Sequence, residues 1–194
     1  MRRTRLLPLA AAAIALGGAC EAAPPPTTPP TTTTVPAPVV RPMTFPVLGG
    51  VSRYADTHGA PRSGGRSHQG QDLMGPKMTE LVAANDGTVT ALRHDSSGLS
   101  GNSLTITDSA GWKYVYIHLN NDRPGTDDGA NIFDQAFAPG LRRGSVVEAG
   151  DLVGYMGDSG NAEDAGSHLH FELHRPDDTV VNAYPSLKAA TVVK

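Results

Sequence analysis

The stretch GSHLHFEL, residues 166–173, alternates apolar and polar side chains along its length. Neighbouring side chains of a β-strand point to opposite faces of a sheet, so the pattern predicts a strand with one apolar and one polar face. The apolar face holds Leu169, Phe171 and Leu173, and the polar face holds His168, His170, Glu172 and the following His174. The first set is suited to a core. In the second, one histidine can bind a metal ion while another stands beside it, although paired histidines also occur on ordinary surface strands.

Four other segments alternate apolar and polar residues or carry β-branched ones, and they lie between turns rich in Gly, Asn, Asp and Ser. They are GTVTAL (87–92), SLTITD (103–108), KYVYIH (113–118) and SVVEAGDLVGYM (145–156). Helical character is limited to a short stretch around Asp134–Phe137. We therefore expect residues 44–190 to form one all-β domain of short antiparallel strands.

The chain has 194 residues and a formal net charge of −3, which implies no strong electrostatic attraction to nucleic acid. Cys20 is the only cysteine, so no disulfide can form within the chain. We expect a monomer without a nucleic-acid partner, held together by packing, to which a bound metal would add.

The N-terminus has the pattern of an export signal. Basic residues at positions 2, 3 and 5 precede an apolar run at 6–19, which is too short to span a bilayer comfortably. Residues 1–19 are thus a predicted signal peptide, and Cys20 resembles the lipidated first residue of a mature bacterial lipoprotein. Ordinary cleavage near Ala22–Ala23 is the alternative. Either way we expect an exported protein of the cell envelope, membrane-anchored or secreted.

Residues 20–43 are rich in proline and threonine and contain EAAPPPTTPPTTTTVPAPVVRP at 21–42. Such a segment has no hydrophobic face to bury, so we expect a disordered, extended linker. It would serve as a tether for the domain or as a passive spacer. A membrane contact is expected only through the lipid anchor.

A second candidate group lies in RSHQGQDL, residues 66–73. On a regular strand His68 and Asp72 would be ~13 Å apart, so a shared metal ion requires a bend, which Gly70 would permit. Two histidines and one carboxylate leave a fourth metal position open, as in catalytic zinc sites.

The third group is KYVYIHL, residues 113–119. A regular strand would place Tyr114, Tyr116 and His118 on the same face. Taken alone, this pattern favours a structural histidine.

In this order, His-x-Gly-x-Asp (68–72), Tyr-x-His-Leu (116–119) and Gly-x-His-x-His-Phe-Glu (166–172) resemble the lysostaphin-type (LytM) zinc metalloendopeptidases, which cut peptidoglycan peptides. The resemblance extends over nearly all of residues 44–187. It implies a β-sheet sandwich of the duplicated hybrid-motif type. It also implies Zn²⁺ as cofactor, with His68, Asp72 and His170 as ligands, and His118 and His168 as catalytic histidines. The sequence does not decide which of these two is the base and which stabilises the oxyanion.

The resemblance implies zinc-dependent hydrolysis of peptidoglycan peptides, and it leaves open which bond is cut. Some members of the family have lost metal ligands and activate other wall hydrolases, so a non-catalytic regulator is the alternative. A biotinyl- or lipoyl-type carrier domain with a modified Lys77 is a third reading, which export and the five assembled residues oppose.

A long segment at 120–143 departs from the shorter family members. This segment would narrow the substrate-binding groove, recognise the substrate peptide or act as a lid. The alternative is a tolerated surface insertion. Adjacent carboxylates at Asp127 and Asp128 raise the alternative of a calcium site, although such pairs are usually just solvated.

Overall fold

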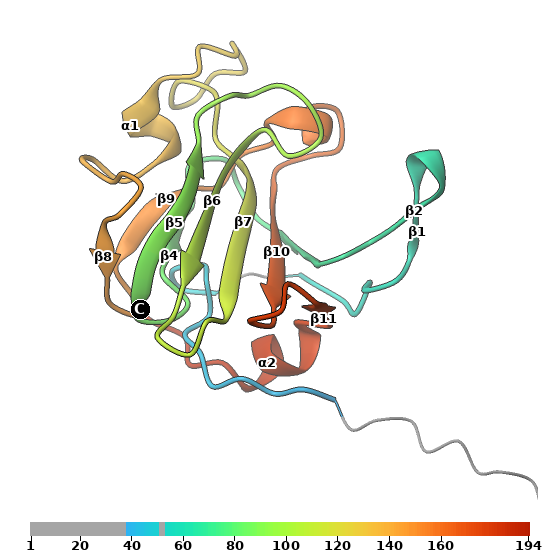
Figure 1. Ribbon diagram of the computed structural model, residues 1–194. Coiled ribbons are helices and arrows are strands. Elements are labelled where there is room, and N and C mark those ends of the chain that lie inside the picture. Colours follow the sequence, from blue (N-terminus) through green and yellow to red (C-terminus); the bar gives the residue numbers. More distant parts are fainter. Residues whose placement is uncertain (1–37, 51–52) are drawn as a thin grey trace, which may run out of the picture. The chain divides into compact units, whose positions relative to one another are not determined.

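The computed structural model describes residues 38–50 and 53–194 (Figure 1). The predicted signal peptide, Cys20 and the predicted linker up to residue 37 lie outside the described residues. In the described part of the chain, no helix is long and apolar enough to span a membrane. The last residues of the predicted linker lie on the domain, because Arg41 forms an ion pair with Asp108 at 2.8 Å and Met43 is buried.

The main sheet is antiparallel, and within the described ranges it has seven strands (Figure 1). Six follow the order β11-β10-β7-β6-β5-β8, and β3 also pairs with β10. Their bounds are β3 Gln71–Met74, β5 Gly87–Arg93, β6 Asn102–Thr107, β7 Lys113–Leu119, β8 Val146–Val147, β10 His168–His174 and β11 Val180–Val181. Two smaller antiparallel pairs join β4 (Glu80–Val82) to β9 (Leu152–Tyr155) and β1 (Pro61–Arg62) to β2 (Arg66–Ser67).

The core lies between the main sheet and the β4–β9 pair. Tyr116 and Phe171 of the main sheet are fully buried in one cluster with Leu81 and Val153 of the small pair. The alternation predicted for β10 is confirmed, since Leu169, Phe171 and Leu173 are all fully buried. The structure thus confirms an all-β domain of short antiparallel strands arranged as a sandwich.

Two short α-helices lie in the described residues (Figure 1). Helix α1, Phe133–Ala136, forms where the sequence predicted it. Helix α2, Tyr184–Ala189, was not predicted, although Pro185 in its first turn is a common helix-start residue. Neither helix disturbs the all-β arrangement of the core.

Tyr116 ties the two layers together, and this leads to a stability prediction. Its buried hydroxyl donates to Val82 O at 2.9 Å and accepts from Ala84 N at 2.7 Å. Tyr116→Phe leaves both buried backbone groups unpaired, so we expect the free energy of unfolding to fall by about 1–3 kcal/mol. Urea unfolding followed by circular dichroism measures the change. As a control, Tyr155→Phe at a half-buried position should cost less than about 0.5 kcal/mol, and equal losses in the two variants would contradict the role of the Tyr116 hydroxyl.

Candidate metal centre

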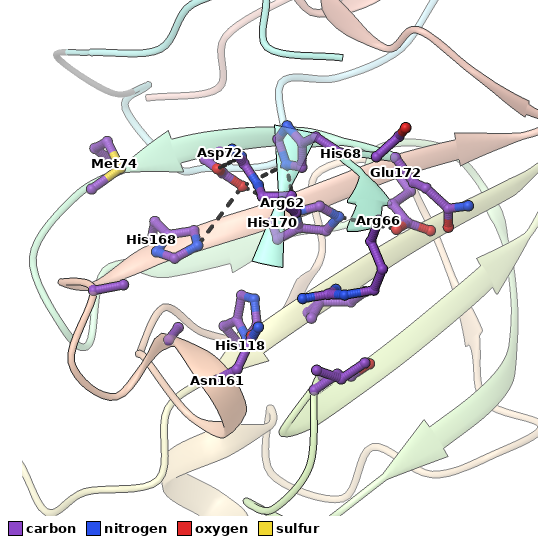
Figure 2. Close-up of a pocket in the computed structure, with 17 residues that line it drawn as sticks. Arg62, Arg66, His68, Asp72, Met74, His118, Asn161, His168, His170 and Glu172 are labelled. Carbon is purple, nitrogen blue, oxygen red and sulfur yellow. Dashed lines mark hydrogen bonds and ion pairs between the residues drawn. The ribbon is translucent and has the colours of Figure 1, made fainter. Parts of the chain in front are cut away.

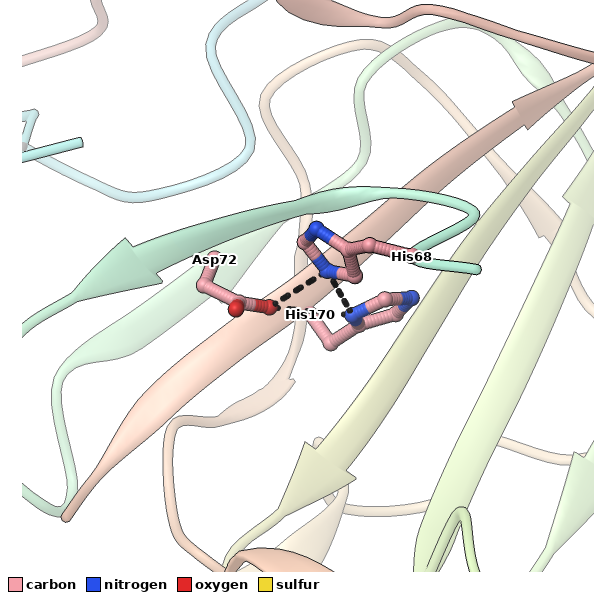
Figure 3. Close-up of side chains that lie close together, drawn as sticks. All are labelled: His68, Asp72 and His170. Carbon is pink, nitrogen blue, oxygen red and sulfur yellow. Dashed lines mark hydrogen bonds and ion pairs between the residues drawn. The ribbon is translucent and has the colours of Figure 1, made fainter. Parts of the chain in front are cut away.

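Strand pairing brings two of the three predicted ligands together. Strand β3 runs antiparallel to β10, and their register places Asp72 directly opposite His170. Side chains opposite each other on one face of an antiparallel pair are near neighbours. Asp72 Oδ1 consequently lies 3.0 Å from His170 Nδ1 (Figure 3).

His68 comes from the loop between β2 and β3. Its backbone is fixed on both sides, because His68 N donates to Ala60 O and Gly59 N donates to His68 O, each at 2.8 Å. Its Nε2 atom lies 3.0 Å from both Asp72 Oδ1 and His170 Nδ1. The three sequence-predicted ligands therefore present one donor atom each to a common point (Figure 3).

This donor set fits zinc. A tetrahedral Zn²⁺ with bonds of 2.0–2.1 Å holds its ligand atoms about 3.3 Å apart, close to the separations found here. Two imidazoles and one carboxylate leave one position open, which is the pattern of catalytic rather than structural sites. The residues present thus match the ion that the sequence predicted.

Gly70 allows the bend that His68 and Asp72 require, and for a reason that the sequence did not reveal. Its φ angle is not in the left-handed region; space is what restricts the position. A Cβ atom there would lie 2.5 Å from Phe171 O and 2.7 Å from His170 Nε2. Only glycine lets the ligand loop approach β10 so closely.

The remaining polar atoms of the three ligands are all bound, which orients the donors. His68 Nδ1–H donates to Thr57 O at 3.0 Å, and His170 Nε2–H donates to Glu172 Oε1 at 3.0 Å. Arg62, on the β1–β2 hairpin, donates to Asp72 Oδ2 at 2.7 Å. The acceptors fix both tautomers, so that His68 Nε2, His170 Nδ1 and Asp72 Oδ1 are the free lone-pair donors.

The same contacts shift the ionisation of the site. Burial opposes the charge of Asp72, but hydrogen bonds from His170 and His68 outweigh it and hold the pKa of Asp72 below its usual range. Burial alone would lower the pKa of His170, whereas Asp72 and Glu172 raise that pKa above its ordinary value. Burial is likewise outweighed at Glu172, where His170 and His174 lower the pKa to about 2. Both carboxylates are therefore charged at neutral pH.

His118 lies beside the metal centre, whereas a regular strand would have placed it on the same face as the two tyrosines. Tyr114 and Tyr116 face the core, but His118 does not share their face and lines the groove. The register of β6 against β7 shifts at this point, pairing Ile117 with Ser103 and Leu119 with Asn102. His118 is the extra, bulged residue, with φ of 66°, an uncommon backbone angle for a non-glycine residue.

His118 and His168 both expose the same ring atom. His118 Nδ1–H donates to Ser159 O at 2.8 Å, and His168 Nδ1–H donates to Gly166 O at 2.7 Å. Each Nε2 is left as a proton acceptor. The ring centroids lie 5.0 Å apart, and His168 Nε2 is 3.8 Å from Asp72 Oδ1. Burial, with a smaller effect of His168, lowers the pKa of His118 to about 4, so its imidazole is neutral at neutral pH.

All five predicted site residues line one groove of about 810 Å³ (Figure 2). Arg62 and Arg66 border it as well, and Leu99, Ala162 and Ala165 add an apolar part. No residue of the 120–143 segment, all of which is described, lines this groove. The carboxylates considered for calcium each lie beside a cation of the protein: Asp127 contacts Lys77 at 2.7 Å, and Asp128 contacts Arg123 at 2.5 Å.

The comparisons with known proteins agree with this geometry. The model of Peptidase family M23 matches residues 66–183, which is more than half of the chain. The chain belongs to this family. The matched range contains all five predicted site residues, from His68 to His170.

Three solved structures resemble this M23 domain. A protein described as a glycyl-glycine endopeptidase LytM from Ruminococcus gnavus is 28% identical, with a TM-score of 0.57 over 78% of this chain and 62% of that one. The catalytic domain of lysostaphin from Staphylococcus simulans is 22% identical, with a TM-score of 0.54 over 70% and 92%. A zinc-containing peptidase from Vibrio cholerae is 22% identical, with a TM-score of 0.54 over 78% and 41%.

The last two likenesses show the fold alone. This chain spans less than two thirds of several proteins that it matches, down to 33% for one of them.

Some functional contacts of the M23 domain were not predicted. The sequence placed Glu172 only on the polar face of its strand, and the structure shows that its carboxylate accepts from His170. Arg62 gave no sequence signal, because an arginine ten residues before its partner could equally be a surface residue. Ser159 was missed for a similar reason, since it acts through its backbone carbonyl.

Gly70 provides a test of the metal centre. Gly70→Ala would push a methyl group against the ring of His170, so we expect zinc affinity to fall roughly tenfold or more. Competition against a zinc-sensitive dye measures it. Gln69→Ala is the matched control, because that side chain is exposed and the change leaves β10 untouched. Unchanged affinity in Gly70→Ala would show that the close approach is irrelevant.

Arg62 provides a second, independent test. Arg62→Ala removes the donor that holds Asp72 Oδ2, and water replaces it only in part, so we expect zinc affinity to fall about tenfold. Calorimetric zinc titration is the measurement. Arg66→Ala on the same hairpin serves as the control, since Arg66 binds Ser63 O rather than a ligand. If the two variants bind zinc equally well, Arg62 does not orient Asp72.

Proposed function

We propose that this M23 domain is a zinc-dependent endopeptidase that hydrolyses peptide bonds of bacterial cell-wall peptidoglycan. One observation carries the proposal: three ligand atoms and two imidazole Nε2 acceptors converge on one open groove. The match to Peptidase family M23 and the R. gnavus neighbour, described as a LytM endopeptidase, support the same chemistry.

The chain's own residues divide the work of hydrolysis. Zinc held by His68, Asp72 and His170 would polarise a peptide carbonyl and acidify a water molecule. His118 and His168 are fixed by their Nδ1–H donors, so each Nε2 can take up a proton from the attacking water or return one to the leaving amine. In the protonated form either Nε2–H can donate to the developing oxyanion.

Substrate class and location follow from the family. M23 peptidases act on cell walls, so the proposed substrate is a peptide of peptidoglycan and the proposed location is the cell envelope. A regulator that only binds other hydrolases would need neither a three-ligand metal set nor two oriented imidazoles. The presence of all five residues therefore favours catalysis.

Hydrolysis of purified peptidoglycan tests the proposal. We expect the zinc-loaded protein to release new amines, a chelator to stop the reaction, and His118→Gln or His168→Gln to lower kcat at least about 100-fold with zinc content retained. Mass spectrometry of the released peptides identifies the bond.

His94→Gln is the control, because His94 contacts Asn131 O and is not part of the groove. The proposal fails if the zinc-loaded wild type releases no amine from any wall type. It also fails if His118→Gln is as active as His94→Gln.

A further inference from the structure

The short segment 157–159 forms hydrogen bonds with both candidate catalytic histidines. Gly157 N donates to His118 O at 3.2 Å, and Ser159 O accepts from His118 Nδ1 at 2.8 Å. On its other side, His168 N donates to Gly157 O at 3.0 Å. The positions of both imidazoles therefore depend on where these three residues lie.

Among the described residues, Asp158, in the middle of this segment, has a single ion-pair partner. Its side chain is only 5% exposed, and Oδ2 forms an ion pair with Lys77 Nζ at 2.8 Å. The other oxygen, Oδ1, has no hydrogen-bond partner among the described residues. A buried carboxylate with one counter-charge is strongly held by that charge. Lys77 therefore fixes the centre of the 157–159 segment.

Lys77 is itself held in place. Its Nζ contacts Asp122, whose side chain is 1% exposed, at 2.6 Å and the exposed Asp127 at 2.7 Å. Burial alone would lower the pKa of Lys77, but the three carboxylates raise it above its ordinary value, so the ammonium stays charged. The next residue, Met78, donates its backbone N–H to Met156 O at 2.8 Å.

These contacts link the strand that carries a metal ligand to the segment that contacts the two candidate catalytic histidines. Lys77 follows β3, the strand that carries Asp72, so the anchor of the 157–159 segment is close in the chain to a metal ligand. Asp122 belongs to the 120–143 segment, which does not line the groove. The inserted segment therefore contacts Lys77, the anchor of the 157–159 segment, without lining the groove.

We propose that the Lys77–Asp158 ion pair is a positioning device, supported by Asp122 of the inserted segment, that fixes the 157–159 segment and through it the imidazoles of His118 and His168. The proposal rests on the proposed hydrolytic function for its kinetic consequence. His118 has a strained backbone angle, which persists only where the surrounding structure imposes it. When the anchor is lost, that angle relaxes and Nε2 moves from its place beside the metal centre.

A matched pair of variants tests this. Asp158→Asn and Asp127→Asn each remove one carboxylate charge from Lys77, but only Asp158 belongs to the segment that holds the histidines. We expect Asp158→Asn to lower kcat at least about tenfold, since misplacement of catalytic groups by about 1 Å can cost 100-fold. KM and zinc affinity should stay near the wild-type values because the groove wall and the ligands are untouched. Asp127→Asn should retain wild-type kcat.

A readout independent of activity accompanies the kinetics. The Nδ1 proton of His118, which the bond to Ser159 O protects from solvent, is assigned by its loss from the NMR spectrum of His118→Gln. We expect this proton to exchange with water at least about tenfold faster in Asp158→Asn and at the wild-type rate in Asp127→Asn.

The outcomes separate the two proposals. If the wild type is inactive, the proposed function fails while the exchange experiment still decides on the ion pair. Wild-type exchange and kcat in a folded Asp158→Asn protein would overturn the positioning role. If thermal unfolding shows that Asp158→Asn does not fold, Asp158→Glu replaces it. This variant keeps the charge but lengthens the side chain by one methylene, so it should show faster exchange and reduced kcat, and wild-type values for both would overturn the proposal.

Discussion

The antiparallel pairing of β3 with β10 is the contact around which the site is built. It sets Asp72 opposite His170, and the two side chains then share one face and one point in space. The pairing also creates the close approach at Gly70, where the chain bends and brings His68 into the same cluster. Without this register, the ligands would lie on unrelated parts of the surface.

The lone pairs of three ligand atoms point toward one another in the site and would repel one another without a cation. Hydrogen bonds to the outer atom of each ligand side chain hold them in this arrangement. Thr57 O, Glu172 and Arg62 each hold the atom that points away from the centre. Because these partners fix tautomer and orientation, the inner atoms are free for a metal. On the polar face of β10, Glu172 thus orients His170 by accepting its Nε2–H.

A different device places the two other histidines. His168 follows the regular alternation of β10, whereas His118 reaches the groove only because β7 carries a bulge at that residue. Both histidines contact the 157–159 segment. Asp158 of that segment is one of the three carboxylates that cluster around Lys77. Through Asp122, the inserted segment 120–143 contacts Lys77 of this cluster without lining the groove.

Much of this protein was determined by local sequence. The alternation in HLHFEL fixes which face of β10 is apolar, because a strand has a two-residue period wherever it lies. The residue types at 68, 72 and 170 predict a metal with an open position, and the ordered motifs indicate the family. Tertiary structure alone decided the rest. The bulge that turns His118 out of the tyrosine face comes from its register against β6. The roles of Arg62, Ser159 and Lys77 depend on contacts between distant segments. Such contacts leave no periodic trace in the sequence, since any arginine, backbone carbonyl or lysine brought to the same place could make them.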